Sequence, residues 1–97
     1  MTEREAKKEL MRRALDIKPS VHVGKDGLKD SLYLEVEDQL KKNRLIKIKV
    51  LDNSDSDVDE VAHEIAERAG GVIVDVRGSV VVMTDKRTWT SLSQKKF

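Results

Sequence analysis

The chain of 97 residues contains no cysteine, one proline and one residue each of tryptophan, tyrosine and phenylalanine. Without cysteine it can form neither a disulfide framework nor a thiolate metal site. Its apolar runs extend over a handful of residues, whereas a membrane-spanning helix needs roughly 20. The charged N-terminal stretch MTEREAKKEL lacks the apolar segment of a signal peptide. We therefore expect a cytoplasmic protein with no membrane association.

The shortage of aromatic residues predicts a core built from aliphatic side chains. Hydrophobic residues make up 38% of the chain and charged residues another 38%. Leu, Ile, Val and Phe together account for 27 of the 97 residues, which is above the range typical of disordered chains. A chain of this length buries roughly two thirds of its unfolded surface, which is enough for one domain.

The net charge of +1 conceals an uneven distribution along the chain. Residues 1–50 contain 13 Lys and Arg against 9 Asp and Glu, whereas residues 51–97 contain 6 against 9. One basic and one acidic half would suit a protein that binds a polyanion on one face. An ordinary mixed surface is the alternative interpretation.

Apolar periodicity predicts seven secondary-structure elements. Apolar residues at three- and four-residue spacing indicate helices, and alternating or β-branched runs indicate strands. Helices are expected over residues 2–17, 28–43 and 58–69, and strands over 21–23, 45–51, 72–76 and 79–83. Pro19 should end the first helix, and Arg77-Gly78 should form a hairpin turn.

This α-β-α-β-α-β-β order predicts an α/β fold with a four-stranded mixed sheet packed with helices, because strand-helix-strand connections favour parallel pairing. The expected domain covers residues 1–84, and residues 85–97 should form a polar tail. We expect Trp89, in that tail, to dock on the core; stacking on a nucleic-acid base is the alternative.

No residue pattern indicates a catalytic, metal or cofactor site. His22 and His63 are too far apart for a local metal motif, and no GxSxG or GxxxxGK[ST] sequence occurs. The acidic stretch 55–59 resembles a calcium loop, but Glu60 stands where an EF-hand requires glycine. These carboxylates are better explained as residues that offset the dipole at a helix N-terminus. We therefore expect a protein that is not an enzyme.

The tetrapeptide Gly24-Lys25-Asp26-Gly27 is the sharpest candidate site. It lies between a predicted strand and a predicted helix, where glycines let another backbone approach closely. The N–H groups that open the next helix favour phosphate, and Lys25 and Lys29 add positive charge. KH domains clamp nucleic-acid backbone with such a GxxG loop. The alternative is a plain turn.

The predicted first helix carries a second candidate site. Arg4, Lys8 and Arg12 form one basic row at four-residue spacing, although stacked like charges destabilise a helix slightly. A solvated face with Glu3–Lys7 and Glu9–Arg13 pairs is the alternative. Lys47 and Lys49, on one side of the second strand, would extend the basic surface, although strand alternation alone also explains them.

Three segments together resemble the CRM domain, the domain of the small free-standing YhbY-like proteins. These segments are PSVHVGKDGL at residues 19–28, LIKIKV at residues 45–50 and AGGVIVDVRG at residues 69–78. The resemblance covers about residues 4–84. It implies a fold similar to the C-terminal domain of bacterial translation initiation factor three, and RNA binding without catalysis. Lys29 departs from the family, which often has a small hydroxyl residue there.

The resemblance assigns RNA binding to the GxxG loop and to the basic first helix. It places the loop at Gly24, Lys25, Asp26 and Gly27, and the basic helix residues at Lys7, Lys8, Arg12 and Arg13. With few aromatic residues, sequence specificity should be weak or supplied by RNA shape. The expected partner is structured ribosomal RNA or a pre-ribosomal particle, with no small-molecule substrate. The alternative function is a protein-interaction module whose basic half binds an acidic protein.

Overall fold

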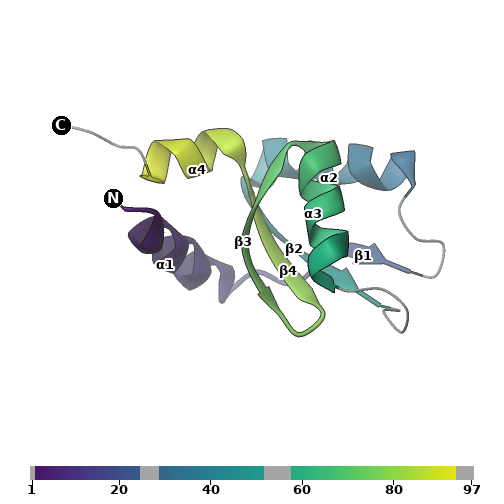
Figure 1. Cartoon of the computed structure of the whole chain (residues 1–97), viewed down its shortest axis with the longest axis horizontal. Coiled ribbons are helices and arrows are strands. Elements are labelled where there is room, and N and C mark those ends of the chain that lie inside the picture. Colours follow the sequence, from purple (N-terminus) through teal and green to yellow (C-terminus); the bar gives the residue numbers. More distant parts are fainter. Residues whose placement is uncertain (1, 25–28, 52–57, 94–97) are drawn as a thin grey trace.

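A computed structural model of the chain describes residues 2–24, 29–51 and 58–93. The helices are α1 (Glu3–Ala14), α2 (Asp30–Asn43), α3 (Val58–Ala69) and α4 (Lys86–Ser93). The strands are β1 (Val21–Val23), β2 (Leu45–Val50), β3 (Gly71–Arg77) and β4 (Val80–Asp85). They form one sheet in the order β1-β2-β4-β3, with β1 parallel to β2 and the other neighbours antiparallel. This α/β arrangement confirms the predicted mixed sheet (Figure 1).

One face of the sheet packs against α2 and α3. Strand alternation points Ile46, Ile48, Val81 and Met83 to this side, where they meet the buried stripes of the two helices. At Gly71 a Cβ atom would lie 2.6 Å from the Met83 sulfur, so a side chain there would displace the core. This core, the larger of the two, holds α2 and α3 on the same face of the sheet.

The opposite face packs against α1 and α4. Leu45, Val74 and Val82 point to this side, and Leu10 and Ala14 of α1 cover them. The partly buried Trp89 and Leu92 of α4 complete this second core, which confirms that Trp89 docks on the core. Figure 1 shows α1 and α4 together at one end of the long axis, away from β1.

Helix α4 was not expected from the sequence, which indicated only a polar tail after the last strand. The carboxylate of Asp85 accepts a hydrogen bond from the Thr88 backbone N–H at 3.4 Å, as at a helix N-cap. The few apolar residues of α4 become informative only when the adjoining surface of α1 is known. The described residues therefore form eight elements, one more than the seven predicted.

Three predicted boundaries were wrong: the end of the first helix, the hairpin turn and the end of the last strand, which extends to Asp85 rather than to residue 83. Helix α1 ends at Ala14 rather than at residue 17, because the chain turns so that Ile17 packs against the second core. The hairpin turn lies at residues 78–79 rather than at Arg77-Gly78, since β3 continues through Arg77 and β4 begins at Val80. Gly78, with φ of 59°, supplies the left-handed conformation of this turn. The shift makes Arg77 a strand residue.

Candidate nucleic-acid interface

Helix α1 exposes all five of its basic side chains. Its capping box joins Thr2 and Glu5, and its buried stripe of Ala6, Leu10 and Ala14 fixes which side faces the sheet. The basic side chains lie on the remaining surface: Arg4, Lys7, Lys8, Arg12 and Arg13. The structure thus places the predicted basic helix on the outside of the α1/α4 layer.

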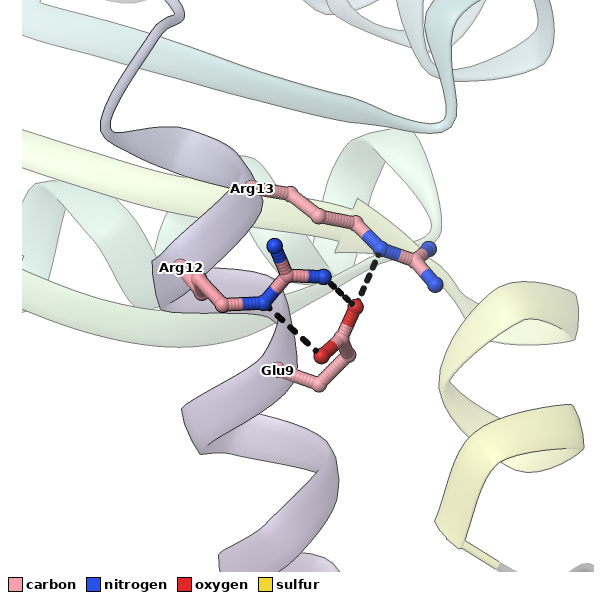
Figure 2. Close-up of polar contacts among 3 residues, drawn as sticks. All are labelled: Glu9, Arg12 and Arg13. Carbon is pink, nitrogen blue, oxygen red and sulfur yellow. Dashed lines mark hydrogen bonds and ion pairs between the residues drawn. The ribbon is translucent and has the colours of Figure 1, made fainter.

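A single carboxylate holds two of these arginines (Figure 2). The Arg12 guanidinium donates two hydrogen bonds to Glu9, at 3.1 and 2.6 Å, and Arg13 Nε donates a third at 2.9 Å. These bonds, first of all those from Arg12, lower the pKa of Glu9. The predicted Glu9–Arg13 pair is confirmed, and Arg12 and Arg13 are therefore partly neutralised within the helix.

A second carboxylate, Asp75 on β3, lies between α1 and the sheet edge. Arg77 Nε donates to it at 3.0 Å, and the Lys7 ammonium lies 3.8 Å away. The hydrogen bond from Arg77 is the main cause of the lowered pKa of Asp75. The expected Glu3–Lys7 pair is absent from the described residues, and Lys7 instead reaches across to the sheet.

These side chains line an open hollow of about 520 Å³ between α1 and β3. Its lining residues are Arg4, Lys7, Lys8, Met11, Asp75 and Arg77. Within the part of the chain that the structure describes, Arg4 and Lys8 form no ion pair. The sequence did not single out Arg77 as a binding residue, because it was assigned to a turn. Arg77 follows Asp75 by two residues, and side chains two residues apart in a strand lie on the same face, so the sequence did contain evidence that the two side chains are neighbours.

The same face of the sheet carries the predicted lysines of β2. Lys47 and Lys49 alternate with buried Ile46 and Ile48, so they point to the α1 side. Strand pairing places His22 beside Lys49, Lys49 opposite Val80, and Val80 opposite Arg77. One row of neighbouring residues therefore crosses all four strands. It carries cationic side chains on β2 and β3 and the exposed side chain of His22 on β1.

The GxxG motif begins at the end of β1. Gly24 directly follows Val23, and a Cβ atom there would meet nothing within 4 Å, so the surroundings leave room for an approaching group. Lys29 is the exposed N-cap residue of α2 and makes no side-chain capping bond, in keeping with its departure from the family pattern. The predicted binding residues Lys25, Asp26 and Gly27 lie outside the described residues.

The other layer is acidic. Together α2 and α3 contain eight Asp and Glu against three Lys and Arg, whereas α1 and α4 contain three against seven. The asymmetry between chain halves that the sequence shows is therefore an asymmetry between the two sides of the sheet. Exposed His63 belongs to the acidic side, on α3.

Residues 2–24, 29–51 and 58–93 contain neither a metal-binding cluster nor a membrane-spanning helix. No group of three or more metal-ligating side chains comes together there. No helix in these ranges is long and apolar enough to span a bilayer. The basic face is consequently the main candidate site in the described structure.

The fold and this face define a small α/β module of the CRM type. The family model for the CRS1/YhbY (CRM) domain matches residues 1–83. The chain belongs to the CRS1/YhbY (CRM) domain family, which confirms the resemblance seen in the sequence.

Individual relatives come from bacteria and plants. The Probable RNA-binding protein YqeI of Bacillus subtilis is 29% identical over 77 residues, covering 79% of this chain and 80% of YqeI. CRS2-associated factor 1, chloroplastic, of Zea mays is 27% identical over 89 residues, and its counterpart in Arabidopsis thaliana is 27% identical over 94. The chain spans 13% of the length of each plant protein.

A solved structure shares the fold. The solution structure of the hypothetical protein SAV1595 from Staphylococcus aureus, to which RNA binding has been ascribed, superposes with a TM-score of 0.74. The two chains are 30% identical, and the match covers 89% of this chain and 90% of SAV1595.

Proposed function

We propose that this protein is a non-catalytic RNA-binding module that grips the sugar-phosphate backbone. The gripping surface combines the basic side of α1, the α1-facing side of the sheet and the GxxG loop. Its partner is structured ribosomal RNA or a pre-ribosomal particle during ribosome maturation in the cytoplasm. The relatives described as RNA-binding support RNA as the class of ligand, and the basic face supports this surface as the place where it binds.

The observation that carries the proposal is the separation of charge between the two sides of the sheet. Phosphate binding is driven mainly by Lys and Arg that displace condensed counterions. Arg4, Lys8, Lys47 and Lys49 make no ion pair with a described residue, so phosphates would not compete with a carboxylate for them. The acidic α2 and α3 would repel the same polyanion and thereby orient it toward the α1 side.

A salt titration tests the backbone grip. Counterion release on single strands gives a log–log slope of about −0.7 per phosphate contacted, so about four contacts give roughly −3. Binding of a labelled single-stranded RNA should weaken with that slope as salt rises. A slope near zero would overturn the proposal.

The contribution of the GxxG loop is tested by Lys25→Asp, which replaces attraction with repulsion where the backbone is proposed to approach. RNA affinity should fall about tenfold, while stability changes by less than about 0.5 kcal/mol, as for surface substitutions generally. Glu67→Lys on the acidic helix α3 alters charge without touching the proposed surface and should not weaken binding. Unchanged affinity of Lys25→Asp would leave the loop as a plain turn.

Sedimentation of cell lysate tests the ribosomal partner. The protein should co-migrate with a ribosomal subunit or its precursor, and ribonuclease should abolish that association. Association that resists ribonuclease would support the protein-interaction module instead.

A further inference from the structure

A second hollow continues from the basic groove toward the end of α1. It has a volume of about 230 Å³, and its walls include Met11 and Leu15 of α1 and Val80 and Val82 of β4. Lys47 and Arg77 stand on the same lining. Leu15 is 79% exposed, the largest exposed fraction among the large hydrophobic side chains of the described structure. Leu15 therefore adds exposed apolar surface to the wall of the hollow.

The size and lining limit what could fill the hollow. Its volume is below the roughly 300–1,000 Å³ of pockets for drug-sized ligands, so it suits one small ring system. Flexible Met11 can adapt to the outline of such a ring. Arg77 is held at Nε by Asp75, which orients its planar guanidinium, a group on which nucleobases stack.

The hollow is continuous with the basic groove, because Met11 and Arg77 line both. An RNA strand whose phosphates follow Arg4, Lys7 and Lys8 would pass directly beside it. The occupant must combine an apolar, planar part with an adjacent anion, and a nucleotide has both.

We propose that this hollow receives one unstacked nucleobase of the bound RNA, between Leu15 and the guanidinium of Arg77. The proposal rests on the proposed function and adds a base-binding subsite to the backbone grip. Bases are available for such insertion in single-stranded loops and bulges of structured RNA. The subsite favours any base over none, because most of its walls offer apolar contact.

Two probes separate the base from the backbone: a single-stranded oligoadenylate, and a ribose-phosphate oligomer of the same length that lacks bases. The wild-type protein should bind the oligoadenylate about tenfold more tightly, a difference in the range of stacking contributions from one base. Leu15→Ala should reduce this preference severalfold, and Leu15→Ala/Val80→Thr should abolish it. Neither should change the affinity for the baseless oligomer or the salt slope.

Leu34→Ala is the matched control, since Leu34 is a 65% exposed leucine on acidic α2. This variant should keep the full preference for the oligoadenylate. Leu15→Ala removes only a solvent-exposed side chain, so it should fold even if the double variant does not, and thermal melts check both.

The outcomes distinguish the two proposals. Equal, salt-dependent binding of both oligomers by the wild type would overturn the base subsite and leave the backbone grip standing. If neither oligomer binds, both proposals are overturned. If an acidic leucine-containing peptide binds in their place and loses affinity on Leu15→Ala, the hollow serves a protein partner.

Discussion

The two helical layers of this molecule pack against the sheet in the same way but carry opposite charge on their exposed sides. Each pair of helices buries an aliphatic stripe against one face of the sheet, but α1 and α4 are predominantly basic and α2 and α3 predominantly acidic. Burial of the inner faces does not determine the charge of the outer faces. The difference in charge between the two layers is therefore not dictated by the packing of the fold.

The layers also differ in how firmly they are held. Among the described residues, the core cluster on the α2/α3 side has twelve buried members and the cluster on the α1/α4 side five, against which the partly buried Trp89 and Leu92 pack. Regions with less buried apolar surface open at lower free energy. The proposed binding layer is thus expected to be the more readily detached of the two.

The largest expected effect comes from reversing charge on the basic layer. Arg4→Glu/Lys8→Glu replaces two attractions with two repulsions in the groove, so RNA affinity should fall about 100-fold at low salt. Glu60→Lys/Glu67→Lys on α3 is the matched reversal and should not weaken binding. Fluorescence anisotropy measures both, and a gain in the α3 variant as large as the loss in the groove variant would show that net charge alone governs binding.

Removing the indole from the second core tests its role in stability. Trp89→Ala should lower the free energy of unfolding by about 2 kcal/mol, less than the 3–5 kcal/mol of a fully buried aromatic, because Trp89 is only partly buried. Exposed Thr90→Ala, on the same helix, should leave stability within about 0.5 kcal/mol. Urea denaturation gives both values, and equal stability of the two variants would contradict the docking of α4.

The lysines of β2 test whether the sheet surface belongs to the binding layer. Lys47→Ala/Lys49→Ala should reduce RNA affinity about tenfold and make the salt slope shallower by about 1.4, because two phosphate contacts are lost. Lys41→Ala/Lys42→Ala on α2 removes the same charge from residues that pair with Glu37 and Asp38. This control should bind like the wild type; if it is equally impaired, the sheet has no special role.

The smallest expected effect concerns Asp75, which joins α1 to β3. Its pKa is lowered chiefly by Arg77, so it stabilises the folded state while ionised, and this contribution is lost as the pH falls. Asp75→Asn should be less stable than the wild type by under about 1 kcal/mol at neutral pH. The gap should begin to close below about pH 4. Thermal melts across pH test this, and a constant gap would mean that the ion pairs contribute nothing.

The sequence predicts the seven elements with strong periodicity, because each stripe can be read without knowing its partner. Helix α4 is missed because two partly buried apolar residues form too short a pattern to predict a helix unless the adjoining surface of α1 is known. Asp85, which caps the helix, was the one local indication of it. The basic residues of α1 and β2 are identified from spacing alone. Their gathering with Arg77 depends on strand pairing, which local sequence does not specify.

The contact between α1 and α4 has a consequence for how this module can be used within longer proteins. Because the first and last helices pack together, the polypeptide enters and leaves on the same side of the unit (Figure 1). A domain with neighbouring entry and exit points can be inserted into another chain as a unit. The chain spans 13% of two plant relatives, a length that leaves room for other segments on both sides of such a unit, and β1 lies at the opposite end of the molecule from α1 and α4 (Figure 1).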